Sequence, residues 1–271
     1  MVAITQKEFR QLADYIKLNY GVNLKEEKKA LITSRLQNEL VKNNLNSFSE
    51  YYDYILSDKS GKAVAALIEK ITTNHTFFMR ESDHFFYFRD MVLPYLKKTI
   101  TDKDLRIWSA GCSTGEEPYT LAMIIDEFFG KEKVLWDTKV LATDISTKVL
   151  EEAKRGIYSN KDIEMLPSHW KLNYFKKLDD KNSVITDKIK KEVIFRKFNL
   201  MNDIFPFKKK FHVIFCRNVM IYFDVQTKRE LVNKFYDLTE YGGYLFIGHS
   251  ESLNGKETKY RYIMPAVYRK I

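Results

Sequence analysis

The sequence predicts an α/β protein preceded by a helical domain, and three observations support this prediction. From about residue 105 onward, short apolar runs alternate with helical segments, which is typical of a parallel sheet covered by helices on both faces. The first 70 residues show helical spacing and no convincing strand. Between about 157 and 197, three short alternating runs with charged turns indicate a small antiparallel insert outside the main sheet.

The helical domain is expected over residues 1–70, because apolar side chains recur there every three to four residues. Its first helix is expected to end near Gly21, since glycine is a common helix stop. A polar linker, residues 71–80, leads to the second domain. The apolar positions that support this prediction are Phe9, Leu12, Ala13 and Ile16 in the first helix, and Ile32, Leu36 and Leu40 in the second.

The α/β domain is expected over residues 81–271. In such sheets, ligands bind beyond the carboxyl ends of the strands. The residues that follow each strand are therefore the candidates for a functional site. The expected strands cover 105–110, 139–144, 211–217 and 243–249, with a final pair around Tyr262 and Val267; the helices cover 120–129, 146–156 and 228–238; the insert runs are 174–178, 183–189 and 192–198.

Composition narrows the functional classes. The chain has 271 residues, 45% of them hydrophobic, which is enough for a substantial core. The net charge is +9, but the segment 71–156 is slightly acidic, so a concentrated nucleic-acid surface is not expected. Cys112 and Cys216 are expected to be reduced thiols in the cytoplasm. The N-terminus is charged and no uncharged run approaches roughly 18 residues, so neither secretion nor membrane spanning is expected.

The segment RIWSAGCSTGEEPYTLAM, residues 106–123, indicates a ligand site. An apolar strand breaks there into a loop bounded by Gly111 and Gly115, and the loop opens a helix whose free amides favour hydrogen-bond acceptors. The dinucleotide fingerprint is absent, and Glu116 and Glu117 follow instead. One acid there could simply serve the helix dipole. Two acids would repel a pyrophosphate but suit a cationic nucleoside, and S-adenosylmethionine is such a ligand.

Asp144 ends the second expected strand, 139–144. An acid at this position of a nucleotide-binding unit accepts hydrogen bonds from ribose hydroxyls. Alternatively, Asp144 caps the helix that follows. The glycine loop favours the ribose role.

The loop sequence G-C-S-T-G also matches the nucleophile elbow of serine hydrolases. Ser113, an aspartate and His249 even occur in the order that such enzymes use. The helix is expected to start only near Glu116, however, and no oxyanion segment is present, so the hydrolase is the weaker hypothesis. His249 is expected to be structural. No His, Cys and acidic residues show metal-ligand spacing, and no metal is expected.

Four motifs stand out along the chain: ITTNHTFFMRESDHF at 71–85, WSAGCSTGEEPYTLAM at 108–123, FCRNVMIYFD at 215–224 and GHSES at 248–252. They give the chain a specific resemblance to the CheR family of chemotaxis receptor methyltransferases. Their order and spacing match the family, and the resemblance covers essentially the whole chain. It therefore implies a Rossmann-like S-adenosylmethionine methyltransferase domain with a small antiparallel β insert and an all-α N-terminal domain.

The resemblance also implies the roles of individual residues. It places Tyr222 at the methyl-transfer position, with Arg80 as a second catalytic residue that orients the substrate carboxylate. It brings the linker 71–80 into the cofactor site. The cofactor contacts that it implies are Asn74, Thr76, Arg80, Glu117, Asp144, Asn199, Leu200, Cys216 through its backbone, Arg217 and Asn218.

The activity implied is transfer of methyl groups from S-adenosylmethionine to glutamate side chains of bacterial chemoreceptors, giving methyl esters and S-adenosylhomocysteine. The partners would be the cytoplasmic domains of the receptors, so that a monomer meets the membrane only through them. Some family members capture a receptor peptide through a glycine-containing loop of the insert. Residues 176–188, KKLDDKNSVITDK, lack glycine, and a tether-independent enzyme is therefore expected.

Two further alternatives remain at this point. A non-catalytic cofactor-sensing module would keep Asp144 and lose residues at the methyl end, whereas Arg80, Asn218 and Tyr222 are all present. An RNA methyltransferase would need stacking aromatic side chains near the site. The aromatic residues Phe77, Phe78, Phe85 and Phe86 offer such a group, but their helical spacing favours a place in the core.

Overall fold

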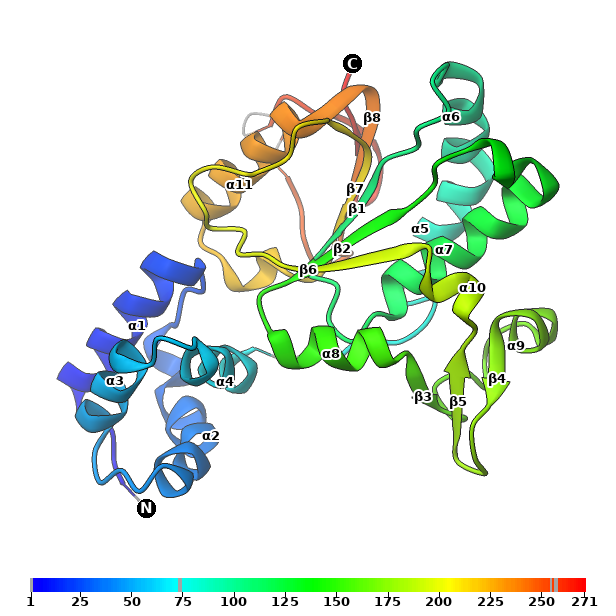
Figure 1. Cartoon of the computed structure of the whole chain (residues 1–271). Coiled ribbons are helices and arrows are strands. Elements are labelled where there is room, and N and C mark those ends of the chain that lie inside the picture. Colours follow the sequence, from blue (N-terminus) through cyan, green and yellow to red (C-terminus); the bar gives the residue numbers. More distant parts are fainter. Residues whose placement is uncertain (1, 73–74, 254, 256–257) are drawn as a thin grey trace.

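The computed structural model describes residues 2–72, 75–253, 255 and 258–271. The N-terminal part is entirely helical and forms its own group of helices in Figure 1. It buries its own apolar core, which includes Phe9, Leu36 and Tyr51. Its helices are α1 (Gln6–Tyr20), the short η1 (Glu26–Lys28), α2 (Lys29–Lys42), α3 (Phe48–Ser57) and α4 (Lys62–Ile71).

Helix α1 has well-defined ends. At its start, the Thr5 hydroxyl accepts a hydrogen bond from the Glu8 amide, and the Glu8 carboxylate accepts one from the Thr5 amide, which is a capping box. At its end, Gly21 adopts φ +73° and donates its amide to the carbonyl of Lys17. This confirms that the first helix stops at Gly21, where the left-handed backbone favours glycine.

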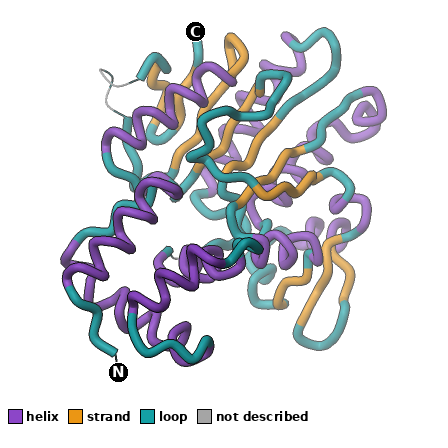
Figure 2. Tube along the Cα trace, turned by 60° about the vertical axis from the view of Figure 1, so that its left-hand side comes forward, coloured by secondary structure: helices purple, strands orange, loops and turns teal. Residues whose placement is uncertain are grey.

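The described part of the second domain contains a seven-stranded sheet in the order β6-β2-β1-β7-β8-β10-β9. Strands β6, β2, β1, β7 and β8 are parallel, and β10 runs antiparallel to both of its neighbours. Figure 2 shows the strands of this sheet with helices beside them. The strand bounds are β1 (Ile107–Ala110), β2 (Val140–Asp144), β6 (Val193–Lys197), β7 (Phe211–Cys216), β8 (Thr239–Ile247), β9 (Arg261–Met264) and β10 (Val267–Arg269).

Both faces of the sheet are covered. Successive side chains of a strand point to opposite faces, so two neighbouring buried residues report on the two sides. In β1, Ile107 packs into one core cluster and Trp108 into the other. The Trp108 ring is fully buried, and its Nε1 donates to Thr143 Oγ1 at 2.9 Å. The helices of this domain are α5 (Ser82–Tyr87), η2 (Phe88–Val92), α6 (Leu93–Thr99), α7 (Glu116–Phe129), η3 (Gly130–Leu135), α8 (Thr147–Arg155), η4 (Met220–Tyr222) and α11 (Val225–Leu238).

The antiparallel insert exists and the run 192–198 does contain a strand, but the prediction that this strand belongs to the insert was wrong. The small sheet has the order β3-β5-β4, whereas β6 pairs with β2 at the edge of the large sheet. At the start of β6, buried positions alternate with a partly buried one, and two exposed positions follow. An edge strand of the large sheet can therefore show the same alternation in sequence as a strand of an antiparallel insert. The small sheet and its helices are β3 (Ile157–Ser159), α9 (Ser168–Tyr174), β4 (Phe175–Lys177), β5 (Asn182–Ile185) and α10 (Asp187–Lys190).

Two further sequence expectations can be compared with the structure. Cys112 and Cys216 are both buried and free. Within the described ranges, no helix combines the length and apolar character needed to cross a membrane.

Candidate functional site

A cavity of about 1160 Å³, counting the solvent-filled space at its mouth, lies where β1, β2 and β7 end. The loops after these strands line one side of it, as expected for a parallel α/β sheet. The helical domain lines the other side with Tyr20, Val22, Ile68 and Glu69. The site therefore lies between two parts of the chain that are far apart in sequence (Figure 1).

The loop after β1 is held against the end of β2. The amides of Gly111 and Cys112 both donate to the Thr143 carbonyl, at 2.8 and 2.9 Å. Gly111 and Ser113 have positive φ angles of +87° and +48°. A Cβ atom at Gly111 would lie 2.4 Å from Val219 Cγ2, so a side chain there would push apart the loops after β1 and β7.

Asp144 is fixed by two backbone amides at the end of β2. Its carboxylate oxygens accept from the Ser113 amide and the Ser146 amide, both at 2.9 Å. Burial raises the pKa of Asp144 above its ordinary value, and these amides oppose that shift in part. The capping alternative is not favoured, because the Ser146 side chain occupies the cap of α8 and accepts from the Val149 amide.

Glu117 and Arg217 form an ion pair on the cavity wall. Glu117 Oε1 accepts from Ser109 Oγ at 2.7 Å, and its Oε2 lies 3.0 Å from Arg217 Nη1. The Arg217 side chain is almost completely buried, and its guanidinium lies 5.0 Å from the centre of the Phe85 ring. Arg217 also donates to the Arg80 carbonyl. The structure thus brings Arg80, Glu117 and Arg217 together, although they come from three separate segments.

Glu81 is a site residue that the sequence prediction missed. One of its oxygens accepts from Asn218 Nδ2 at 3.1 Å, and the other accepts from Arg217 Nη2 at 3.0 Å. Burial works to raise the pKa of Glu81, but the hydrogen bond from Asn218 and the charge of Arg217 bring it below its ordinary value. The available signal was its place beside Arg80 in the motif at 71–85.

Glu251 is a second missed residue, and it holds Asn218 from the other side. Its Oε2 accepts from the amides of Asn218, at 3.1 Å, and Gly248, at 2.6 Å. Burial raises the pKa of Glu251, and the amide hydrogen bonds reduce that shift. A Cβ at Gly248 would lie 2.4 Å from Asn218 Nδ2. The motif GHSES at 248–252 therefore supports the cavity wall from behind.

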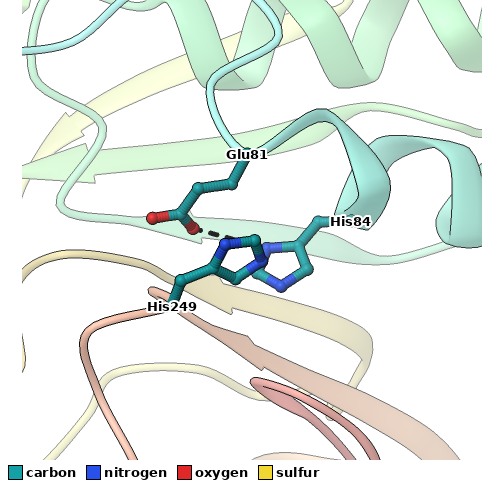
Figure 3. A group of neighbouring side chains, drawn as sticks. All are labelled: Glu81, His84 and His249. Carbon is teal, nitrogen blue, oxygen red and sulfur yellow. Dashed lines mark ion pairs between the residues drawn. The ribbon is translucent and has the colours of Figure 1, made fainter.

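Figure 3 shows Glu81, His84 and His249 gathered beside this wall. One donor atom of each lies within 4.8 Å of the others, a proximity that sequence spacing did not reveal. Burial, followed by the charge of Arg217, lowers the pKa of His84 to about 4. Because Glu81 already binds Arg217, a metal ion here would place a second cation beside a buried guanidinium. The expectation of no metal stays a prediction.

Most of the predicted cofactor and catalytic residues line the cavity. Arg80 Nη1 also donates to the His75 carbonyl. Cys216 ends β7 with its side chain in the core and is not among the described lining residues, and Asn74 lies outside the described residues. The predicted residues that line the cavity are Thr76, Arg80, Glu117, Asp144, Asn199, Leu200, Arg217, Asn218 and Tyr222.

The hydrolase hypothesis finds no support in the site geometry. Among the described residues, the buried Ser113 Oγ has no hydrogen-bond partner, whereas a nucleophilic serine needs a histidine within reach. His249 Nε2 lies 3.1 Å from Asp83 Oδ2 instead. Helix α7 begins at Glu116, three residues after the serine, which confirms the expected helix start.

The four phenylalanines considered for the RNA hypothesis differ in their exposure to solvent. Phe78 and Phe85 are buried, and Phe77 and Phe86 are each 45% exposed. The core interpretation is confirmed for the first pair only. The Phe86 ring lies 5.2 Å from the Arg89 guanidinium, so one of the exposed rings contacts a cation of its own helix region.

The chemistry of the cavity fits S-adenosylmethionine. Asp144 is an acceptor at the end of β2 with capacity left for ribose hydroxyls. Glu117 supplies negative charge, and the unpartnered Ser113 Oγ noted above is a donor and acceptor in the loop between them. The fold and this site define an S-adenosylmethionine-dependent methyltransferase.

Comparison with known proteins identifies the family. Residues 74–268 match the model described as "CheR methyltransferase, SAM binding domain", and residues 7–72 match "CheR methyltransferase, all-alpha domain". The chain belongs to the CheR methyltransferase family.

Curated relatives agree with this assignment over more than nine tenths of their length. The "Chemotaxis protein methyltransferase" of Borreliella burgdorferi is 45% identical over 99% of this chain and 96% of its own. The protein of the same description from Escherichia coli is 32% identical over 98% and 92%. The solved glycopeptide N-methyltransferase MtfA with S-adenosyl-L-methionine covers 59% of this chain and 53% of its own at 13% identity and a TM-score of 0.32, a likeness that supports nothing further. The chain is an S-adenosylmethionine-dependent methyltransferase of chemotaxis.

Proposed function

We propose that the methyl acceptors are glutamate side chains in the cytoplasmic domains of chemoreceptors, and that the enzyme acts on them as a cytoplasmic monomer. The observation that supports this most directly is the cavity at the ends of β1, β2 and β7, with a cation-binding acid, an arginine and a tyrosine on its wall. The descriptions of the curated relatives as chemotaxis methyltransferases supply the biological setting.

We assign the work to three parts of the chain. Residues 1–70 form the helical domain, the linker 71–80 closes on the cofactor, and 81–271 form the methyltransferase domain. Asp144 holds the ribose and Glu117 the ammonium group, while Arg80 and Tyr222 orient the acceptor. The remaining proposed cofactor contacts are Asn74, Thr76, Asn199, Leu200, Arg217, Asn218 and the backbone of Cys216.

The acceptor needs little acid or base help, because a glutamate with a pKa of about 4.3 is ionised at neutral pH. S-adenosylmethionine, when bound, would supply a sulfonium-activated methyl group. The carboxylate oxygen would form the new C–O bond as the S–CH3 bond breaks, which gives the methyl ester and S-adenosylhomocysteine. The protein's part is alignment, which can supply roughly 7 to 11 kcal/mol. Arg80 orients the carboxylate without holding its attacking oxygen, since a tight ion pair there would weaken the nucleophile.

Tyr222→Phe tests the catalytic assignment. Removing one hydroxyl that orients the acceptor should lower turnover roughly 10-fold, in line with a hydrogen bond of about 1.4 kcal/mol, and should leave affinity for S-adenosylhomocysteine nearly unchanged. Steady-state kinetics and calorimetric titration measure the two effects. A loss found entirely in cofactor affinity would remove Tyr222 from the methyl end of the site.

The substrate proposal is tested with receptor cytoplasmic fragments from the organism that encodes this chain. They are incubated with the enzyme and methyl-labelled S-adenosylmethionine, and the label is then released with mild base. Methyl esters are base-labile, whereas N-methyl groups are not. Base-stable label, or label restricted to side chains other than glutamate, would reject glutamate O-methylation.

We further propose that the enzyme is independent of a receptor tether. The turn between β4 and β5 contains Leu178, Asp179, Asp180 and Lys181, with no glycine. Asp179 accepts from the Lys181 and Asn182 amides, so the turn is closed by its own carboxylate. A pentapeptide ending in an aromatic residue should not bind detectably by calorimetry. Micromolar binding would overturn the proposal.

A further inference from the structure

The end of α1 contacts the segment that carries Tyr222. The Asn23 amide donates to the Tyr222 carbonyl at 2.8 Å. Val22 and Phe223 form an antiparallel bridge beside it. Val22 is buried, and Tyr222 and Phe223 pack against the core cluster of the helical domain. A residue proposed to act at the methyl end is thus hydrogen-bonded through its backbone to the other domain.

Two polar side chains reinforce this contact. Lys17 Nζ lies 2.8 Å from Asp224 Oδ2, and Asp224 accepts from the Thr227 amide at the start of α11. Asn199 Nδ2 donates to the Asn19 carbonyl at 2.8 Å. The last turn of α1 therefore holds the segments after β6 and after β7, and both segments line the cavity.

Gly21 allows this close approach. With φ +73°, it sits where a Cβ atom would lie 2.5 Å from Met201 Sδ and 3.1 Å from both Phe223 Cε1 and Thr227 Cγ2. A side chain at this position would separate α1 from the same two segments. The glycine that stops the helix thus also lies where α1 packs against the segments after β6 and β7.

The other end of α1 is hydrogen-bonded to α3. Besides capping the helix, Glu8 accepts hydrogen bonds from the Ser49 amide, at 2.9 Å, and the Ser49 hydroxyl, at 3.1 Å. The helix is thus fixed to α3 at one end and to the methyltransferase domain at the other.

We propose that residues 17–23 are a positioning element that sets the place of Tyr222 for methyl transfer. This inference rests on the proposed function. The element acts on Tyr222 through its backbone, and neither Asn23 nor Lys17 is among the residues that line the cavity. Loss of the Asn23 amide or of the Lys17 ion pair should therefore lower turnover and leave cofactor affinity largely intact.

A matched pair at Asn23 tests the hydrogen bond itself. Asn23→Pro removes the amide that donates to Tyr222, whereas Asn23→Ala keeps the amide and removes only the side chain. We expect the proline variant to lower kcat about 5- to 10-fold, the range of one lost hydrogen bond, with the Kd for S-adenosylhomocysteine within about twofold. The alanine variant should match the parent protein.

A second pair at Lys17 separates positioning from folding. Lys17→Met removes the ion pair with Asp224, and Lys17→Arg can keep it. Lys17→Met should lower kcat about threefold, and Lys17→Arg should restore the parent value. Thermal melts of each variant show that the assayed protein is folded. Loss of kcat in both Lys17 variants alike would contradict a role for the ion pair.

The decisive readout combines Asn23→Pro with Tyr222→Phe. If the amide acts through Tyr222, the proline should cost less than about twofold in the phenylalanine background. A full 5- to 10-fold loss in that background would overturn the inference, as would a proline variant with parent kcat. If the parent protein methylates no receptor glutamate, the proposed function fails and this inference fails with it. An active parent with an unaffected proline variant rejects the inference alone.

Discussion

Glu116 and Glu117 are adjacent in sequence but have different environments. Glu117 faces the cavity and pairs with Arg217. Glu116 points away from the cavity, is buried, and accepts from Thr114 Oγ1 at 2.8 Å. Burial raises the pKa of Glu116, and the Thr114 hydroxyl opposes that shift. Only one acid of the pair is available to a cationic ligand, because successive helical residues point about 100° apart.

Glu117→Gln should therefore weaken S-adenosylhomocysteine binding by about 10- to 100-fold, the range of a lost charge-assisted hydrogen bond. The change removes the negative charge that we propose to face the ammonium group, and it removes one of the two carboxylates that pair with Arg217. Calorimetric titration measures the affinity.

Glu116→Gln is the matched control, since it makes the same chemical change one position earlier. Its affinity for S-adenosylhomocysteine should stay within about threefold of that of the parent protein. Equal losses in the two variants would mean that the charge of the helix start, and not the carboxylate of Glu117, governs binding.

Single residues also show what the sequence could predict. Asp144 ends β2, and the rule that ligands bind beyond strand ends made it a candidate. Arg217 and Asn218 were implied by the family resemblance, and their place directly after β7 agrees with the same rule. Glu81 and Glu251 could not be located in this way, because their carboxylates bind protein groups behind the cavity wall and neither is among the residues that line the cavity. Their roles depend on which segments meet in space.

At the level of elements, the loop after β1 depends on close approach. Gly111→Ala would add left-handed strain of roughly 1–2 kcal/mol and a contact of 2.4 Å with Val219. Overpacking of this kind typically costs a further 1–3 kcal/mol. We expect the free energy of unfolding to fall by about 2–5 kcal/mol and cofactor affinity to fall as well, since Val219 follows Asn218 on the cavity wall. Denaturant unfolding and calorimetry measure the two quantities.

Gly61→Ala provides the control for this prediction. Gly61 also has a left-handed backbone, with φ +67°, but the nearest atom to an added Cβ is Lys197 Nζ at 3.6 Å. In the Gly61→Ala variant, the free energy of unfolding should fall only by the contribution of backbone strain, roughly 1–2 kcal/mol, and the cofactor affinity should equal that of the parent protein. If Gly111→Ala lowers the free energy of unfolding no more than Gly61→Ala does, Val219 moves away from the added methyl group at no cost in stability, which contradicts the prediction.

The strand 193–197 shows why one element was assigned to the wrong sheet. Its alternation is real, but alternation reports that one face is exposed and not which sheet the strand joins. Its neighbour β2 lies some 50 residues earlier in the chain. The charged turns around β4 and β5 continue up to this strand, and the prediction therefore included it in the antiparallel insert.

The whole molecule has a site that neither domain completes alone. Sequence patterns predicted both parts of the chain and the strand-end residues of the second. They did not predict that Tyr20, Val22 and Ile68 line the cavity, because apolar helical residues look the same whether they face their own core or a neighbouring domain. The polar composition of the linker 71–80 likewise gives no indication that Thr76 and Arg80 line the cavity.

Global stability should fall on mild acidification, because two histidines are buried in neutral form. Burial, followed by the charge of a nearby arginine, lowers the pKa of His84 and of His212 to about 4, from an ordinary value of 6.5. Between about pH 6.5 and 4 the unfolded chain binds the protons that the folded chain excludes. Each histidine then removes about 1.4 kcal/mol of unfolding free energy for each pH unit of acidification. Above about pH 6.5 neither contributes to the slope.

Leucine substitutions separate this effect from the titration of carboxylates. His84→Leu should reduce the slope of unfolding free energy against pH by about 1.4 kcal/mol per unit between pH 6 and 5, and the double variant with His212→Leu by about twice that. The slopes come from urea unfolding at several pH values, so a constant change in stability from the substitution itself cancels. If His84→Leu keeps the parent slope, His84 takes up its proton in the folded protein as readily as in the unfolded chain, and the carboxylates account for the acid sensitivity.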